Sequence, residues 1–301
     1  MAKTVVMLLA AFATAVSGQQ DWLNTVGLRA DKSNVLRAGG VVLPVSGRHN
    51  FWSWPGGVVP YYIDPVYTDE EKAQIKKAIS AVQRSLSGPP SAVQCIRFEE
   101  VNPNSSKFKI KITPFKQDGV TKEQYCSSYP GIYKPFLASK RTEERVVLAT
   151  GENGCFDGSQ RSLMKIFTII LGKRNEHQRP DRNKYLTFNP ENVQPGIEVA
   201  YRLHPKESFL YLCDYDYCSI THNQPSDFAK PGTFAFTVKN APHHIPKLDK
   251  LSGCDCQELT ELYRCKTDVC DFWDCEAQVP PSDSDVPLPP VEAKSPTAAA
   301  E

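Results

Sequence analysis

Histidine is the side chain best suited to bind a catalytic metal or to transfer a proton at neutral pH, and this chain of 301 residues contains six. None of them forms the His-x-x-x-His pair that places two imidazoles on one face of a helix. The chain also has no Gly-x-Ser-x-Gly turn, no phosphate-binding loop and no cysteine that stands out as a reactive thiol. We therefore interpret the histidines as structural or surface residues: His49, His177, His204, His222 and the adjacent pair His243 and His244.

A nearly apolar segment, Leu163–Leu171, is long enough for a buried helix, and a polar segment follows it. Within it, Lys165 and Ile169 have the spacing that puts two side chains on the same helix face. Neither side chain can bind a metal, because isoleucine has no lone pair and a lysine ammonium is a donor without an acceptor. Asn175 offers only an amide oxygen, which alone is a poor ligand for zinc.

Six short blocks of sequence point to a known family. Residues 176–182 read Glu-His-Gln-Arg-Pro-Asp-Arg and resemble the segment that directly follows the zinc helix of astacin-family metalloproteases. Further blocks are similar to family segments and occur in the same order, at residues 54–61, 95–98, 125–131 together with 154–155, 192–196 and 262–265. The resemblance covers residues 54–265.

The resemblance implies an α+β fold: a two-lobed metzincin domain over residues 54–265. Its N-terminal lobe would hold a mixed twisted sheet with helices, and its C-terminal lobe would be irregular and linked by disulfides. Local patterns agree with this fold. Residues 69–82 predict a helix with Thr68 as its N-cap and Glu71 in the capping-box position, and residues 108–112 and 145–149 predict strands.

The family carries its zinc on the motif His-Glu-x-x-His-x-x-Gly-x-x-His. Aligned on Gly172, the three ligand positions of this chain hold Lys165, Ile169 and Asn175, and the catalytic glutamate position holds Ile166. The resemblance thus predicts a degenerate site with no catalytic residue and no metal cofactor.

A second family motif, the methionine turn Ser-Ile-Met-His-Tyr, reads Ser-Ile-Thr-His-Asn at residues 219–223. Thr221 replaces the methionine beneath the metal, and Asn223 replaces the tyrosine that helps to stabilise the transition state. His177 and His222 match family positions outside the metal shell, so we interpret them as retained supporting residues.

Glu176 allows two interpretations. In the family the equivalent glutamate lies at the buried amino terminus of the processed chain, so its retention would indicate that processing and insertion of that terminus survive. Alternatively, Glu176 pairs with the nearby Arg179 or Arg182.

The two ends of the chain differ from its centre. Residues 1–18 have a Lys3 n-region, an apolar run and small residues before Gln19, as in a secretory signal. Residues 19–53 form a short leader, residues 266–278 a cysteine-containing extension, and residues 279–301 a Pro-, Ser- and Ala-rich tail that we expect to be disordered. The net charge of +1 excludes a general affinity for nucleic acid, and the chain has no second long apolar run that would span a membrane.

Ten cysteines in an exported chain favour disulfides over metal-binding thiolates. The resemblance implies the pairs Cys95–Cys265 and Cys126–Cys155. The other six can pair in 15 ways, among which the sequence does not choose: Cys213, Cys218, Cys254, Cys256, Cys270 and Cys275. Asn104, in Asn-Ser-Ser, is a candidate for glycosylation.

Three functions remain open. We favour a secreted, extracellular pseudoprotease that binds a protein or peptide in a cleft, floored by the Leu163–Leu171 helix and edged by the strand at 145–149. The first alternative is a zinc-dependent metalloendopeptidase of the astacin family, with zinc as its cofactor. The second is a structural component of the extracellular matrix.

Overall fold

The computed structural model describes residues 51–273, with gaps at residues 88–94, 134–138, 140, 207–208, 210, 240–243 and 266–268. The predicted signal, most of the leader and the C-terminal tail lie outside the described residues, as do His49, His243 and Cys275. Within the described part of the chain, no helix combines the length and the apolar character that crossing a bilayer requires.

The N-terminal lobe is built on a four-stranded sheet. Its order is β3 (Arg97–Glu100), β2 (Val58–Ile63), β4 (Lys109–Thr113) and β6 (Glu143–Val147), and neighbouring strands are parallel. Beyond β6, Ser127 forms an antiparallel bridge with Val147, so the sheet is mixed at this edge, as expected. A small antiparallel pair, β1 (Phe51–Trp52) with β5 (Ile132–Tyr133), is separate from it.

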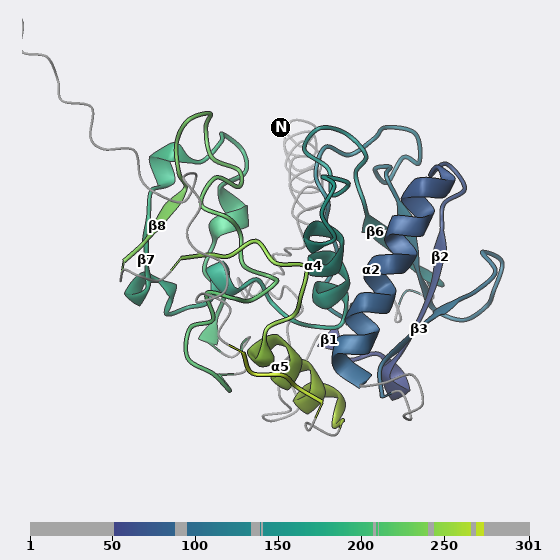
Figure 1. Ribbon diagram of the computed structural model, residues 1–301. Helices are drawn as coiled ribbons and strands as arrows, with labels where there is room; N and C mark the ends of the chain where they lie inside the picture. Colours follow the sequence, from purple (N-terminus) through teal and green to yellow (C-terminus); the bar gives the residue numbers. More distant parts are fainter. Residues whose placement is uncertain are drawn as a thin grey trace, which may run out of the picture.

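Three helices complete the main core. Figure 1 shows α2 (Asp69–Ser87) and α4 (Arg161–Ile170) side by side in front of the sheet, with α5 (Gly253–Tyr263) below them. The predicted cap of α2 is present: the Thr68 side chain accepts from the Glu71 amide, and the Glu71 carboxylate accepts from the Thr68 amide. The helix is one turn longer than the sequence predicted and buries Ile75, Ile79 and Val82 against α4 and the sheet.

The C-terminal lobe has little regular structure. Apart from several short 3-10 turns, its described part contains the antiparallel pair β7 (Leu186–Phe188) and β8 (Phe236–Val238). A second core, which includes the aromatic side chains Tyr201, Tyr215 and Phe236, holds this lobe together. The two-lobed α+β fold that the sequence predicted is therefore observed.

The predicted strands at 108–112 and 145–149 are β4 and β6, and their bounds differ by one or two residues from the prediction. The family-like block at residues 54–61 begins with a turn: Pro55–Gly57 is a 3-10 turn, and β2 begins at Val58. Gly57 has a φ of +70°, and a Cβ on it would lie 1.9 Å from the Cys95 carbonyl oxygen. Only glycine therefore allows this turn to pass so close to the segment that leads into β3.

Four disulfides connect described residues. Cys95 is bonded to Cys265 and Cys126 to Cys155, the two pairs that the resemblance implies. Two further bonds join Cys213 to Cys254 and Cys256 to Cys270, and Cys218 is also disulfide-bonded.

Candidate functional site

The C-terminal end of α4 is fixed by partners from distant parts of the chain. The Trp54 indole donates to the Ile170 carbonyl at 3.0 Å, and the Tyr263 hydroxyl donates to the Leu171 carbonyl at 2.9 Å. These bonds satisfy carbonyls that a helix end leaves without an intrahelical donor. Gly172 then takes a φ of +115°, which turns the chain sharply. The segment 173–178 therefore leaves α4 in a defined direction.

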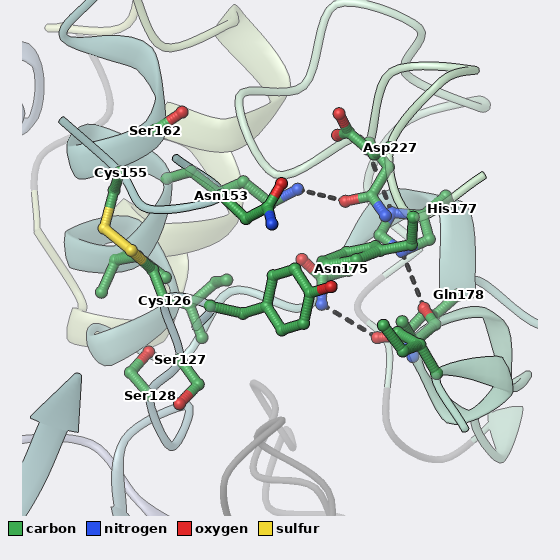
Figure 2. A pocket seen from close by; sticks show the side chains of 18 of the residues that line it. Cys126, Ser127, Ser128, Asn153, Cys155, Ser162, Asn175, His177, Gln178 and Asp227 are labelled. Atoms are coloured by element: carbon green, nitrogen blue, oxygen red, sulfur yellow. Dashed lines mark hydrogen bonds between the residues drawn. A yellow bond between two sulfur atoms is a disulfide. The ribbon is translucent and has the colours of Figure 1, made fainter. Parts of the chain in front are cut away.

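A cavity of about 460 Å³ lies between the two lobes, beside α4. Figure 2 shows Ser127, Ser128 and the Cys126–Cys155 disulfide on one side of it, and Asn175, His177 and Gln178 on the other. Side chains from α4, from the 173–178 segment and from the 219–228 region all line it. Five of the six degenerate positions of the sequence analysis, all except Thr221, therefore line one cavity.

The edge of this cleft differs from the prediction. The sequence analysis placed it on residues 145–149, but Ser127 exchanges two backbone hydrogen bonds with Val147, at 2.8 and 3.0 Å. Residues Tyr125 to Ser128 lie against that strand and line the cavity. The segment 125–128 therefore forms the edge of the cleft.

Lys165 projects from α4 into the cavity, where the first ligand of the family motif would stand. Its ammonium donates to the Asn223 side-chain oxygen through a short hydrogen bond and lies 3.5 Å from the His222 carbonyl oxygen. Burial lowers the pKa of the Lys165 amine to about 8, although the Asp227 carboxylate opposes this shift. The side chains at two degenerate positions that are far apart in the sequence, Lys165 and Asn223, are thus hydrogen-bonded to each other.

Ile166 and Ile169 also line the cavity, although their side chains are only 5% and 8% exposed. Their side chains make this part of the cavity wall apolar. A polar or charged group placed against them would gain no hydrogen bond from either side chain.

Thr221 bonds to the 173–178 segment, which lines the cavity. Its hydroxyl donates to the Arg174 carbonyl at 2.7 Å and accepts from the Glu176 amide at 3.3 Å. Arg161, on α4, holds the turn of Thr221 from the other side by donating to the Ser219 and His222 carbonyls at 3.0 and 3.3 Å. A hydrogen-bonding side chain therefore takes the place of the family's methionine.

His177 and His222 are both buried, and all four of their ring nitrogens have partners. His177 accepts from the Asn223 amide through Nδ1 and contacts the Ala200 carbonyl through Nε2. His222 contacts the Asn223 carbonyl through Nδ1 and the Tyr215 hydroxyl through Nε2. Burial lowers the pKa of His222 to about 3 and that of His177 well below its usual value, so both rings are neutral at physiological pH.

This donor set does not fit the zinc ion that the family motif binds. The first ligand position holds a cation bonded to Asn223, and the second holds an aliphatic side chain. The third is an amide whose nitrogen donates to the Gln178 side chain at 2.9 Å. Zinc sites are built from imidazole, thiolate or carboxylate groups. Over the described ranges, no three or more such groups lie together in a way that could hold a metal ion.

A polar network that the sequence analysis missed lines the C-terminal side of the cavity. The Gln178 side chain accepts from Asn175, lies 3.2 Å from His204 Nε2, and donates to the Val199 carbonyl at 3.3 Å. One guanidinium nitrogen of Arg174, Nη1, lies 3.3 Å from both ring nitrogens of His204. The adjacent basic pair Lys173-Arg174, directly after an apolar helix, was the available signal in the sequence.

Glu176 belongs to a buried ionic cluster. Lys173 Nζ lies 2.7 Å from Glu258, 3.5 Å from Glu176 and 3.6 Å from Asp255. Arg179 also pairs with Glu176, at 3.0 Å, as one of the two interpretations expected. Among the described residues, the Glu176 carboxylate is therefore paired with two cations, Lys173 and Arg179.

Arg182, the other pairing partner suggested for Glu176, instead donates to the His177 carbonyl at 2.8 Å.

Comparisons with known proteins agree with this architecture. The family model named Astacin, which describes a peptidase family, matches residues 47–264. Zinc metalloproteinase nas-6 of Caenorhabditis elegans is 27% identical over 218 residues, which are 71% of this chain and 55% of that protein. Tolloid-like protein 1 of Mus musculus is 26% identical over 219 residues, 70% of this chain and 19% of that protein. The chain thus spans about half or less of the length of these relatives.

Among solved structures, a similar one is high choriolytic enzyme 1, a hatching enzyme zinc-protease from the medaka Oryzias latipes. It has a TM-score of 0.56 and 24% identity, and the match covers 72% of this chain and 96% of that chain. At this identity the likeness shows the fold alone. Because the family model covers most of the chain, from the first strands to Arg264, the chain belongs to the astacin family of peptidases.

Proposed function

We propose that this chain is a secreted, non-catalytic member of the astacin family that binds an extended protein or peptide segment in its cleft. The observation behind this proposal is the bond between Lys165 and Asn223. These residues stand at the first ligand position and at the tyrosine position, and a cation at that point repels a zinc ion. The paired cysteines and the signal-like N-terminus support secretion.

Hydrolysis of a peptide bond in this family needs a polarised water and a general base. Ile166, at the position of the base, can neither accept nor donate a proton. The neutral imidazoles of His177 and His222 are buried, and all their nitrogens are hydrogen-bonded. Neither the residue at the position of the base nor these two histidines can therefore activate a water molecule for hydrolysis.

The cleft keeps what a peptide-binding groove needs. The segment 125–128 forms its edge, and a cavity with apolar and polar walls lies beside that edge. Extended peptides bind such grooves through backbone hydrogen bonds to the edge and through side chains in the adjacent pocket. No metal takes part in this mode of binding.

A zinc-dependent metalloendopeptidase is the second candidate, and membership of the astacin peptidase family favours it. Its zinc would need ligands other than Lys165, Ile169 and Asn175. This candidate predicts one zinc ion per chain and cleavage that a chelator inhibits.

Elemental analysis and a cleavage assay on the purified full chain separate the two candidates. We expect no stoichiometric zinc and no cleavage of casein. The triple variant Lys165→His, Ile169→His, Asn175→His should then bind zinc without cleaving, and adding Ile166→Glu should give weak cleavage because it supplies the general base. Chelator-sensitive cleavage by the unmodified chain would instead establish the second candidate.

A further inference from the structure

Arg174 differs from the other buried cations near the cavity. Its side chain lines the cavity, and the residue is only 4% exposed. Lys173 and Arg179 each have carboxylates within 3.6 Å, and Lys165, Arg161 and Arg182 each have a carbonyl oxygen within 3.5 Å. Among the described residues, by contrast, the Arg174 guanidinium has neither a carboxylate within 4.0 Å nor a carbonyl acceptor, and its contacts are with His204. Its charge is therefore buried without a counter-ion from this part of the chain.

The neighbours of Arg174 hold its guanidinium in place but do not neutralise it. Nη1 contacts His204, whose pKa burial and the Arg174 charge lower well below the usual value, so the ring is neutral. Nε is buried and has no hydrogen-bonding partner in the part of the chain that the structure describes. Burial lowers the pKa of Arg174 to about 9, which still leaves it charged at neutral pH. An isolated buried charge is costly, so an anion that reaches this group would offset much of that cost.

Three more atoms of cavity-lining residues are buried and without a partner in the described structure, and one of them is the amide donor Asn223 Nδ2. Asn175 Oδ1 is an acceptor and Ser128 Oγ is a hydroxyl, and both residues line the same cavity as Arg174. Figure 2 shows Ser128 and Asn175 on opposite sides of it. An unpaired cation, an unpaired acceptor and an unpaired hydroxyl thus surround one space, and a polypeptide segment has groups that satisfy all three.

The carboxylates that line the cavity leave the Arg174 charge uncompensated. Asp157 accepts from the side chains of Ser159 and Ser162, and Asp227 accepts from the Gln224 amide. Asp227 acts on the charge of Lys165, and Glu152 is exposed. None of the three lies within 4.0 Å of the Arg174 guanidinium, and burial lowers the pKa of Arg174.

From these contacts we infer that Arg174 binds a carboxylate of the polypeptide in the cleft, with Asn175 Oδ1 accepting a backbone N–H beside it. The inference rests on the proposed function and gives it a ligand class: segments with an acidic side chain, or with a free C-terminal carboxylate, at this subsite. A guanidinium suits this role because its planar fork matches a carboxylate in two parallel hydrogen bonds.

Fluorescence polarisation on the full chain with three labelled libraries of eight-residue peptides tests the inference. The first library is C-amidated and carries Asp or Glu at each position in turn. The second is also C-amidated and carries Asn or Gln instead. The third has neutral side chains and a free C-terminal carboxylate. We expect either the first or the third library to bind about tenfold more tightly than the second. Tighter binding of the first library would identify an acidic side chain as the source of the carboxylate, and tighter binding of the third would identify the C-terminus.

Variants then assign the preference to Arg174. Arg174→Gln should abolish it while leaving the affinity for neutral peptides unchanged, and Arg174→Lys should retain part of it because the charge remains. Arg202→Gln is the matched control, since Arg202 is exposed and does not line the cavity. Because Arg174 has no carboxylate partner among the described residues, Arg174→Gln should not lower the melting temperature, and a melting curve checks that this variant is folded.

Several outcomes would overturn the inference. Equal affinity for acidic and neutral libraries, or a preference that persists in Arg174→Gln, would remove the subsite and leave peptide binding intact. Competition by inorganic phosphate as strong as that by the acidic peptide would mean that the site takes small free anions. No binding of any library would overturn the proposed function, and the subsite with it.

Discussion

Lys165 shows how one substitution changes the chemistry of a whole site. A histidine at this position would be neutral and could give a metal its lone pair, whereas the ammonium of Lys165 donates to Asn223. The cavity therefore has an internal cation that needs acceptors, and Asn223 and the His222 carbonyl provide them. This pairing ties α4 to the 219–223 turn.

Lys165 should make stability depend on pH in a specific direction. Its pKa falls from 10.5 in the unfolded chain to about 8 in the folded protein, so between these values the unfolded state binds more protons. The free energy of unfolding should therefore rise with pH across this window. Relative to Lys165→Met, the unmodified protein should gain on the order of 2 kcal/mol between pH 8 and pH 10.

Urea denaturation of both proteins at several pH values measures this difference. Lys184→Met serves as a control, because Lys184 is exposed and its removal should shift the whole curve without changing its slope. Parallel curves for Lys165→Met and the unmodified protein would mean that the Lys165 amine titrates as in water.

Asn104 is a second residue whose prediction depends on its surroundings. It lies in an exposed turn between β3 and β4, where a glycan would meet no packed surface. We expect mass spectrometry of the chain secreted from eukaryotic cells to find a glycan on Asn104, and Ser106→Ala to remove it because the sequon is lost. An unmodified Asn104 peptide from such material would contradict the prediction.

At the scale of elements, the ionic cluster around Lys173 connects α4 to α5. Lys173 follows α4, whereas Asp255 and Glu258 belong to α5, and the side chains of all three are at most 6% exposed. Asp255 also caps the amino end of α5, where its carboxylate accepts from the Ser252 amide. One buried ammonium thus balances the carboxylates of two elements that are about 80 residues apart.

Lys173→Met should destabilise the fold by about 3–5 kcal/mol, because it leaves buried carboxylates without their cation. Adding Glu258→Gln to this variant should recover part of the loss, since it removes one of the uncompensated charges. Chemical denaturation of the single and double variants measures both values, with Lys184→Met as the exposed control at roughly 0.5 kcal/mol or less. A double variant less stable than the single one would show that Glu258 does not act through Lys173.

Local signals in the sequence were sufficient to predict helices and strands, but not the contacts between side chains in the site. The cap of α2 depends on Thr68 and Glu71, three residues apart, so it could be read directly. The partner of Lys165 lies 58 residues away, and nothing in the sequence pairs Lys165 with Asn223. The sequence also could not show that the Arg174 guanidinium lacks a counter-ion among the described residues, because the groups around it come from distant parts of the chain.

At the scale of the whole molecule, both lobes are closed by segments that return from far along the chain. The α5 helix belongs to the C-terminal half in sequence, yet it packs into the core of the N-terminal lobe. Cys265, just after α5, bonds to Cys95 before β3, and Cys213 in the C-terminal lobe bonds to Cys254 on α5. The first bond connects α5 to the sheet of the N-terminal lobe, and the second connects α5 to the C-terminal lobe. The family resemblance was needed to predict Cys95–Cys265, because spacing alone does not distinguish it from other pairings.

The disulfides should differ in their contribution to stability according to the loops they close. Cys95 and Cys265 are separated by 170 residues, and Cys256 and Cys270 by 14. The entropy that a cross-link removes from the unfolded chain grows with loop length, which gives about 5 kcal/mol for the first bond and about 3 kcal/mol for the second. Both bonds lie at the α5 side of the N-terminal core, so their surroundings are comparable. Guanidinium denaturation of Cys95→Ala/Cys265→Ala and of Cys256→Ala/Cys270→Ala should therefore show the larger loss of unfolding free energy for the first double variant. A larger loss for the second would mean that packing around α5, rather than loop closure, determines the effect.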